Sequence, residues 1–528
     1  MNFLEGEGNR GEIDWNFEER FAGLSKAPIA VLSDVHLYDA EELGSTGTAF
    51  NQYLASDRKL LKESEAILDA ALKKVAGSGA QYLLIPGDLT KDGEKINHEL
   101  LAKKLAALEE TTGIEVFVIN GNHDISNAHA VRFNGDTTEK VDTVDTEEFQ
   151  DIYEDFGYGQ AVAQDPNSLS YAVDLGEDYR LIVMDACIYN NDKVNPKQET
   201  GGEFDNDTLN WVLAQIKAAV KAGRRPIGMM HHGLVPHTGV QPTMFSEYLV
   251  KDYETVANTL ADAGMNLVFT GHFHSQDTSS IETDKGNVLY DVETGSLVTS
   301  PCPIRYVRLS DDSVSYTTEH VEAIEGMDNF KQYAANFLQT GMEGLVEALL
   351  PGVLMQNGVP ADHAKGMAKR LANQELAGVT VKSLLAGAFA AHYAGDEQMT
   401  EGVQAIVTGL AAQEGDAATK ALYQLLAGTV TSLYTDSDPA DCKVSDLKLS
   451  ALPTYPSGGG SSHGGSSSGS SSNITTTTEK NPDGSTTTTT VNKTTGAVTE
   501  TTKTASGVTG TTVTDKNGKV TEVKASIP

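Results

Sequence analysis

The sequence predicts an α/β protein in which two β-sheets pack face to face between outer helices, a four-layer αββα sandwich. Three observations lead to this prediction. Short apolar runs rich in branched residues, typical of buried strands, recur between residues 27 and 274. Stretches with helical spacing of apolar residues separate them, as βαβ units require. After residue 274, short alternating segments indicate antiparallel strands that close the domain.

The expected elements follow one another in order. Apolar runs predict buried strands at 29–32, 82–85, 116–119, 227–230 and 267–269. Helical periodicity predicts helices at 58–75, 94–108, 205–222 and 253–263. Alternation predicts strands at 279–283, 287–293, 304–309 and 313–318.

The second half of the chain changes character twice. Ala-, Leu- and Met-rich segments predict helices at 342–350, 363–376, 381–393 and 417–433. Gly352, Gly395 and Gly415 are expected to interrupt or end them. A Ser/Gly stretch then reads as a flexible linker, and a Thr-rich tail follows. We therefore expect an extension at 1–26, a main domain at 27–322, a helical domain at 326–452, a linker at 453–472, and a tail at 473–528 that is disordered or forms marginal β-hairpins around the turn signals 481–484 and 515–518.

Composition excludes several classes of protein. The net charge of −35 over 528 residues argues against nucleic-acid binding, which needs a basic face. Three widely spaced cysteines make neither a zinc knuckle nor a disulfide framework. No apolar run is long enough to predict a transmembrane helix, and the first residues do not read as a signal peptide. Because spacer-like tails are typical of surface proteins, we expect a secreted or cell-surface location with the leader absent, and a cytoplasmic one as the alternative.

Five polar blocks carry the chemistry, and each follows a predicted strand. They are Asp34-Val35-His36, Gly87-Asp88, Gly121-Asn122-His123-Asp124, His231-His232 and Gly271-His272-Phe273-His274. Ligands bind at the carboxyl ends of strands in open α/β sheets, so these side chains are expected to converge. Oxygen and nitrogen donors without thiolate suit Mn, Fe, Zn or Co, and two adjacent metals suit phosphoester hydrolysis.

Spacing within the blocks supports a shared site. Alternate residues leaving a strand point the same way, so Asp34 and His36 can reach one ion, as can His272 and His274. The amide oxygen of Asn122 is a further possible ligand.

The order D-x-H, G-D, G-N-H-D, H-H and G-H-x-H resembles the calcineurin-like metallophosphoesterase superfamily over residues 27 to 320. The stretches 87–94 and 121–127 are most similar to the class III cyclic nucleotide phosphodiesterase branch. The resemblance implies a dinuclear centre with two ligand sets that share Asp88: Asp34, His36, Asp88 and His274, and Asp88, Asn122, His231 and His272. Gly233 departs from the family, which often has Pro after the paired histidines.

The resemblance also implies roles for the remaining residues. His123 would assist the leaving oxygen, and Asp124 would orient His123. His232 is expected behind the ligands, and His237 is a candidate for substrate contact. His98 and His129 are expected on a helix surface or in loops.

The implied reaction is hydrolysis of a small phosphodiester, with 3′,5′-cyclic AMP as one candidate, by a hydroxide bridging two ions, for which Mn, Fe or Zn are expected. Alternatives are a phosphomonoesterase or nucleotidase, a phospholipid-directed hydrolase, or a surface scaffold or adhesion protein. The stretches 190–204 and 235–248 are expected at the rim of the site. The helical domain could cover the site, dimerise or complete a core, and the oligomeric state stays open.

Overall fold

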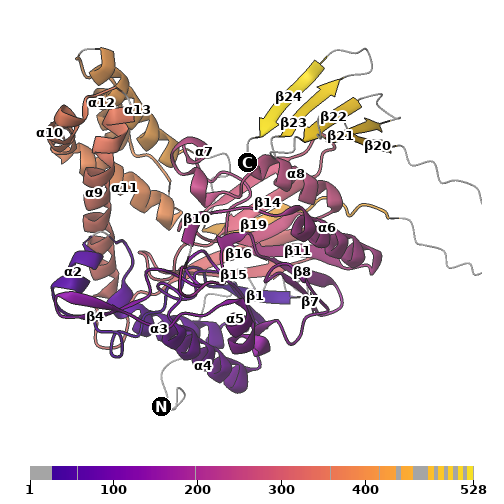
Figure 1. The fold of residues 1–528 in the computed structure, drawn as a ribbon. Helices are drawn as coiled ribbons and strands as arrows, with labels where there is room; N and C mark the ends of the chain where they lie inside the picture. The colour runs from indigo at the N-terminus through magenta and orange to yellow at the C-terminus, as the bar shows by residue number, and fades with distance from the viewer. Residues whose placement is uncertain are drawn as a thin grey trace, which may run out of the picture. The chain divides into compact units, whose positions relative to one another are not determined.

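The computed structural model describes residues 27–55, 57–196, 198–356, 358–395, 397–415, 417–435 and 442–455, and five strands between 474 and 526 (Figure 1). The expected N-terminal extension, residues 456–472 of the expected linker and both turn signals of the tail lie outside the described residues. The chain divides into two compact units, Met1–Pro456 and Ser457–Pro528.

Two sheets form the centre of the first unit. One has the order β19-β16-β15-β1-β2-β3 and the other β13-β14-β12-β11-β8-β7-β6. The strands of the first sheet are β1 (Ala27–Val31), β2 (Tyr82–Pro86), β3 (Glu115–Ile119), β15 (Pro303–Leu309), β16 (Ser313–His320) and β19 (Lys443–Lys448). Those of the second are β6 (Ala163–Gln164), β7 (Tyr171–Leu175), β8 (Tyr179–Met184), β11 (Arg225–Met230), β12 (Leu267–Thr270), β13 (Thr278–Glu282) and β14 (Val288–Glu293).

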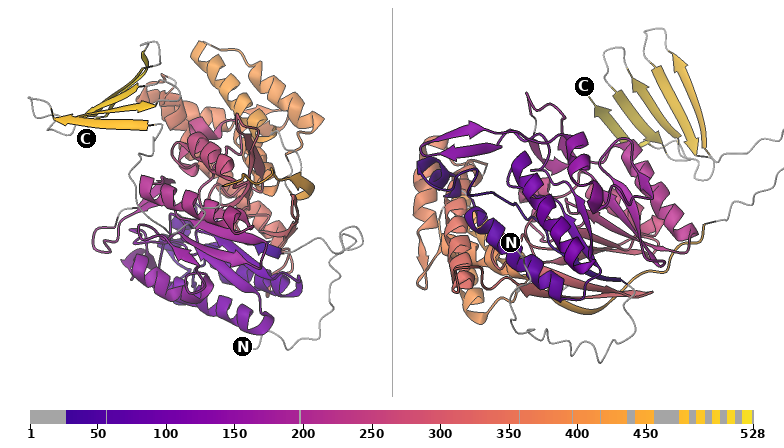
Figure 2. Two further views of the ribbon diagram at one scale, coloured as in Figure 1. Left: turned by 90° about the vertical axis from the view of Figure 1, so that its right-hand side faces the viewer. Right: turned by 90° about the horizontal axis from the view of Figure 1, so that it is seen from below.

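Helices cover both outer faces of this pair of sheets (Figures 1 and 2). The helices before β14 are α2 (Thr48–Leu54), α3 (Ser64–Gly77), α4 (Lys95–Thr112), α5 (Thr146–Ile152), α6 (Asn206–Lys221), α7 (Gln241–Met244) and α8 (Tyr253–Ala263), with 3₁₀ turns at Leu61–Glu63, Glu154–Phe156 and Ser246–Tyr248. Short two-stranded pairs join β4 (Val131–Asn134) to β5 (Thr137–Lys140) and β9 (Cys187–Tyr189) to β10 (Gln198–Gly202). The four-layer αββα sandwich is confirmed.

Alternation along β8 shows how the layers are built. Leu181 and Val183 lie in the core between the sheets, whereas Ile182 and Met184 lie in a second core under α6 and α8. A central strand buried on both faces needs apolar residues at every position, which explains the continuous apolar runs. Burying such side chains contributes about 1.5–3 kcal/mol each.

The predicted helix at 58–75 begins later than expected. The Asp57 carboxylate accepts hydrogen bonds from the backbone N–H groups of Arg58 and Lys59, and Leu60 N–H donates to the Val298 carbonyl. These bonds hold 57–60 as a turn, so helix α3 starts only at Ser64. Arg58 and Lys59 are therefore loop residues.

A helical region follows β16 and has its own core. Its elements are α9 (Phe330–Gln356), α10 (Ala361–Ala372), β17 (Glu375–Leu376), β18 (Val379–Thr380), α11 (Val381–Ala394), α12 (Glu401–Ala411) and α13 (Ala417–Leu433). Helix α12 was not predicted. The predicted helix at 342–350 is also shorter than α9, which continues through Pro351 and Gly352. Leu350 and Leu354 lie on one face of α9 and are both buried, so packing holds this turn despite the proline. Gly395 ends α11 in the left-handed conformation, as predicted.

Strand β19 lies within the expected helical domain, after its last predicted helix. It pairs antiparallel with β16 and adds an edge strand to the first sheet. The chain therefore returns to the sandwich after the helical region, which is part of the same compact unit.

The second unit contains a five-stranded antiparallel sheet in sequential order. Its strands are β20 (Ile474–Lys480), β21 (Thr486–Asn492), β22 (Val498–Lys503), β23 (Thr509–Thr514) and β24 (Val520–Ser526). Adjacent strands pair as hairpins, the arrangement expected of alternating Thr and Val.

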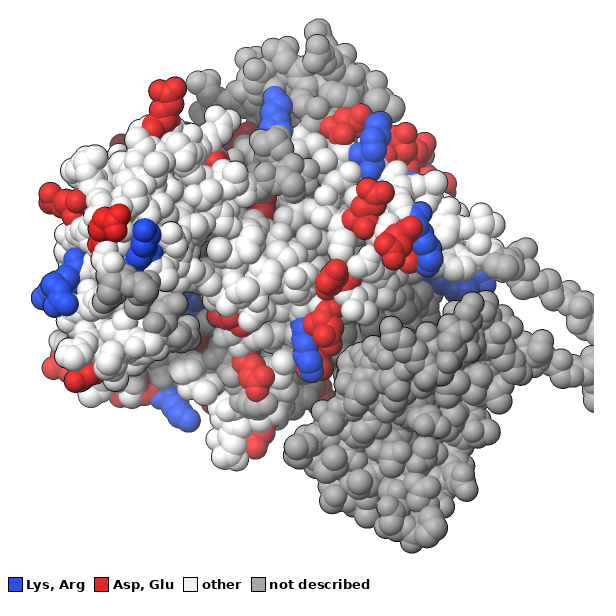
Figure 3. Space-filling view, turned by 90° about the horizontal axis from the view of Figure 1, so that it is seen from above, with Lys and Arg blue, Asp and Glu red and all other residues white. Residues whose placement is uncertain are grey.

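The surface mixes charges of both signs. On the face in Figure 3, Lys and Arg side chains stand singly or beside acidic ones, with uncharged surface between them. Within the described residues, no helix has the length and apolar character that a membrane crossing requires.

Candidate metal centre

The polar blocks converge at one edge of the sandwich because their strands run parallel. β1, β2 and β3 are parallel neighbours in the first sheet, and β11 and β12 are parallel neighbours in the second. Each block begins within three residues of its strand's carboxyl end. The two sheets meet at this edge, where the His231 ring donates through Nδ1–H to the Pro86 carbonyl, 2.9 Å away.

The first candidate cluster consists of Asp34, His36 and His274, all buried, whose ligand atoms lie within 4.8 Å of one another. His274 Nε2 is 3.3 Å from Asp34 Oδ1. His36 Nε2 is buried, has no hydrogen-bond partner in the described part of the chain, and lies 3.9 Å from Asp34 Oδ1. A buried nitrogen without a partner that faces a carboxylate fits a metal ligand.

The second candidate cluster consists of Asp88, His231 and His272. His231 Nε2 lies 3.4 Å from Asp88 Oδ2 and 3.1 Å from Asn122 Oδ1. Two atoms that each bind one ion at about 2.1 Å lie about 3.0–3.4 Å apart, so these spacings fit a shared ion.

Neighbouring carbonyls orient the rings of this cluster. Because His231 donates to Pro86 through Nδ1–H, its Nε2 is left facing Asp88. His272 donates through Nε2–H to the Thr200 carbonyl at 3.0 Å, which leaves Nδ1 as its ligand atom. Such bonds fix the tautomer of a metal-binding imidazole.

Backbone conformation sets these residues apart. Five candidate ligands have positive φ, between 39° and 76°: Asp34, His36, Asp88, His272 and His274. Each such non-glycine residue costs on the order of 1–3 kcal/mol, and this strain concentrates at functional sites. The fold holds these side chains in place at an energetic cost.

Two motif glycines allow the blocks to approach each other. A Cβ on Gly121 would lie 2.1 Å from Asp88 Oδ1, and one on Gly271 would lie 2.4 Å from Asp34 Oδ2. No side chain fits at either position without displacing a candidate ligand.

The electrostatics of the second cluster favour an ionised carboxylate. Burial would raise the pKa of Asp88, but the imidazoles of His231, His123 and His36 hold this pKa well below its usual range. Burial would likewise lower the pKa of His231, yet Asp88 outweighs burial and raises it to about 9. Asp88 is therefore deprotonated, as a metal ligand must be.

His123 is held by a carboxylate other than the expected one. Its Nδ1–H donates to Asp92 Oδ1 at 2.8 Å, and its backbone N–H donates to Asp88 Oδ1 at 2.9 Å. Buried Lys91 forms ion pairs with Asp92 and Glu94. The sequence contains this signal, since Asp92 follows Asp88 by four residues in a tight loop, but the spacing alone did not show which carboxylate reaches the ring.

The expectation that Asp124 orients His123 is therefore wrong. Both Asp124 oxygens accept bonds from backbone N–H groups, those of Leu89, Thr90 and Gly121, at 2.8–3.0 Å. Burial, with Asp88 adding to it, raises the pKa of Asp124 to about 7. Asp124 therefore links the loop after Asp88 to the Gly121 block through backbone hydrogen bonds, and it does not orient the His123 ring.

The other predicted histidines have different surroundings. His232 is buried, its ring centroid lies 4.5 Å from that of His272, and it donates to Thr200, so it lies behind the ligands as expected. His129 is exposed in a loop, whereas His98 is fully buried and donates to the Asp124 carbonyl, not on a helix surface as expected.

The expected substrate contact by His237 does not fit its position. The ring is only 1% exposed, and its neighbours are the carboxylates of Asp277 at 2.8 Å, Glu293 at 3.4 Å and Asp291 at 3.5 Å. A buried ring enclosed by acidic side chains has no surface for a substrate. His237 instead neutralises buried charge beneath the 235–248 loop.

Both expected rim stretches reach the site. Thr200 and Glu247 present backbone carbonyls to His272, and the Tyr248 ring centroid is 4.6 Å from that of His272. Gly233 explains its departure from the family pattern: its N–H donates to the Tyr248 carbonyl, which Pro could not do.

Sequence reasoning missed two cations beside the centre. Burial lowers the pKa of His274, and the positive charges of Arg58 and Lys59 lower it further. The sequence placed Arg58 and Lys59 in the predicted helix 58–75, and neither belongs to a recognisable motif. Their position near the site depends on the loop before α3.

A match to a protein family covers the strands and blocks that form this site. Residues 27–276 match the family of calcineurin-like phosphoesterases. A search of curated proteins finds no match. Among solved structures, a dimetal phosphatase from Danio rerio is 14% identical with a TM-score of 0.41, over 56% of this chain and 96% of that one. A phosphopantetheinyl hydrolase from Mycobacterium tuberculosis is 10% identical with a TM-score of 0.28, over 52% and 90%.

The chain contains a calcineurin-like phosphoesterase region at residues 27–276. It is a metal-dependent phosphoester hydrolase with two candidate metal-binding clusters.

The close approach at Gly121 gives a first prediction. Gly121→Ala should displace Asp88 and lower both metal content and phosphoesterase activity at least tenfold, because the added Cβ would occupy the position of Oδ1. Gly77→Ala is the control, since no atom lies within 4 Å of its Cβ. Metal analysis and turnover are the measurements, and a fully loaded, active Gly121→Ala enzyme would contradict the geometry.

The His123–Asp92 bond gives a second prediction. Asp92→Asn keeps the shape but removes the charge that holds the ring, so turnover should fall roughly tenfold to hundredfold. Metal content should stay at the level of the unsubstituted protein, because Asp92 lies in neither cluster. Unchanged turnover would show that the bond does not position His123.

Proposed function

We propose that the protein hydrolyses a phosphodiester at a dinuclear metal centre held by Asp34, His36, Asp88, Asn122, His231, His272 and His274. One observation carries the proposal: a single oxygen, Asp88 Oδ2, lies 3.5 Å from His36 Nε2 and 3.4 Å from His231 Nε2. One carboxylate thus faces imidazoles of both clusters, which is the position of a bridging ligand.

Two divalent ions, when bound, neutralise the charge of a phosphoester and supply an activated water. The donor set of imidazole, carboxylate and amide oxygen fits Mn, Fe or Zn. Asp88 is shared between the ligand sets, while Asp34 and Asn122 each serve one of them.

His123 is the group that assists the leaving oxygen. Its side chain is 22% exposed, unlike the buried ligands, and its Nε2 lies 4.0 Å from Asp88 Oδ2. Asp92 holds Nδ1, so Nε2 is the atom that faces the site. Although burial opposes it, Asp88 and Asp92 raise the pKa of His123, which favours the protonated ring that a departing alkoxide needs.

A panel of substrates tests the reaction class. Bis(p-nitrophenyl) phosphate, p-nitrophenyl phosphate and 3′,5′-cyclic AMP are compared with Mn, Fe and Zn added separately. Preference for the diesters supports the proposal, and the cyclic nucleotide is included because of the resemblance to class III phosphodiesterases. Preference for the monoester would make the protein a phosphomonoesterase, and loss of all activity on chelation is expected in either case.

Two substitutions separate metal binding from proton transfer. Asp88→Ala should lose at least one of two ions per chain, because it removes the shared ligand. His123→Ala should keep both ions and lose roughly 10²–10⁴-fold in turnover. Two ions retained by Asp88→Ala would refute the bridging role, and full turnover by His123→Ala would remove that residue from the reaction.

The tail offers a check on the scaffold alternative. Ser457–Pro528 is a compact unit of its own, so an enzyme that uses it as a spacer should keep full activity without it.

A further inference from the structure

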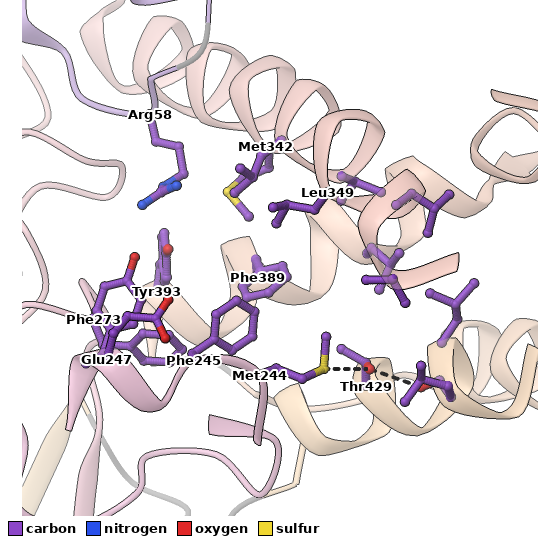
Figure 4. A pocket seen from close by; sticks show the side chains of 18 residues that line it. Arg58, Met244, Phe245, Glu247, Phe273, Met342, Leu349, Phe389, Tyr393 and Thr429 are labelled. Carbon is purple, nitrogen blue, oxygen red and sulfur yellow. Dashed lines mark hydrogen bonds between the residues drawn. The ribbon is translucent and has the colours of Figure 1, made fainter. Parts of the chain in front are cut away.

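An apolar pocket of about 250 Å³ lies between the helical region and the edge of the sandwich that carries the candidate metal centre (Figure 4). Most of its lining is Leu, Val, Met and Phe from α9, α11, α13 and the segments around α7. An engineered cavity of about 150 Å³ lined by such residues holds a benzene ring, so this pocket has room for a somewhat larger apolar group.

The pocket adjoins the proposed catalytic site through three of its lining residues. Phe273, which lines it, stands between His272 and His274 in the sequence. Tyr248 and Tyr393 also line it, and their ring centroids lie 4.6 Å from that of His272 and 6.3 Å from that of His274. A molecule bound at the metals therefore has the pocket beside it.

A cation stands at the end of the pocket near the metals. Figure 4 shows the Arg58 guanidinium directed toward Tyr393, with Phe273 and Glu247 below it. The Arg58 guanidinium interacts with the Tyr248 and Tyr393 hydroxyls, but its Nε atom is buried and has no hydrogen-bond partner in the described part of the chain. A buried donor without a partner suits an anionic group of a ligand.

Part of the apolar lining is exposed. Leu349 and Leu425 line the pocket and are 50% and 36% exposed, which is unusual for large apolar side chains. A chain longer than the pocket could extend past them. A nucleobase would find few polar partners among these residues for its ring nitrogens and amino group, which burial makes costly to leave unpaired.

We propose that this pocket binds the alkyl or acyl chain of an amphiphilic phosphodiester substrate, with the phosphate at the metal centre and near Arg58. The inference rests on the proposed phosphodiesterase function and names its substrate class. The helical region then acts as the specificity element, since α9, α11 and α13 supply most of the pocket.

Binding of alkylphosphonates to the full-length, Mn-loaded protein tests the pocket without turnover. Methyl-, butyl- and octylphosphonate carry the same head group and differ only in the chain. Calorimetry should show Kd falling up to roughly fourfold for each methylene that enters the pocket, until the pocket is full. Equal Kd values across the series would overturn the proposal.

Two matched variants locate the effect. Leu349→Glu places a charge in the pocket lining, whereas Met355→Glu places the same charge on the same helix outside the lining, at a similarly exposed position (50% and 47%). Leu349→Glu should abolish the chain-length dependence, and Met355→Glu should preserve it. If both variants or neither changes the dependence, the chain binds elsewhere.

Turnover of methyl and octyl p-nitrophenyl phosphate separates failure of the two proposals. The octyl diester should have the higher kcat/KM, and Leu349→Glu should reduce it to the value of the methyl diester. Equal hydrolysis of both diesters would refute the pocket but leave the phosphodiesterase intact; no hydrolysis of either would refute the phosphodiesterase. If Leu349→Glu impairs cyclic AMP hydrolysis alone, the pocket holds a base and the proposal is wrong.

Discussion

The Asp88 carboxylate is the constraint on which the candidate centre depends. It is almost fully buried, and a buried charge without partners costs several kcal/mol. The imidazoles of His36 and His231 approach it from two different sheets. The positive φ angles of the ligands and the glycines at 121 and 271 follow from this requirement, because several polar groups must meet around one point.

The helical region is connected to this centre through a few aromatic contacts. The Phe273 ring centroid lies 5.8 Å from that of His392, near the end of α11. It also lies 5.6 Å from that of Phe245, which in turn lies 5.8 Å from that of Phe389 in α11. The same block of sequence thus supplies ligands on both sides of Phe273 and a surface for the helices. A change in the helices can therefore reach the ligands by packing alone.

Much of the fold was predictable because it depends on local pattern. Strands buried on both faces need continuous apolar runs, and β1, β2, β3, β11 and β12 all lie where those runs predicted. The failures occur where a distant contact overrides local preference. Packing of Leu350 and Leu354 carries α9 through Pro351, and pairing with β16 makes a strand of 443–448, which the sequence assigned to the helical domain.

By itself the sequence determined that five polar blocks end five buried strands, and parallel strands necessarily bring such blocks to one edge. The resemblance then divided the ligands of these blocks into two sets, and residues of both sets lie together in the two clusters. Only the tertiary structure decided which side chains meet across blocks: Asp92 and not Asp124 at His123, His237 among buried carboxylates, and Arg58 beside the apolar pocket. The reason is physical. Strand order places a block at an edge, but the direction of a side chain there depends on loop conformation and on partners far away in the chain.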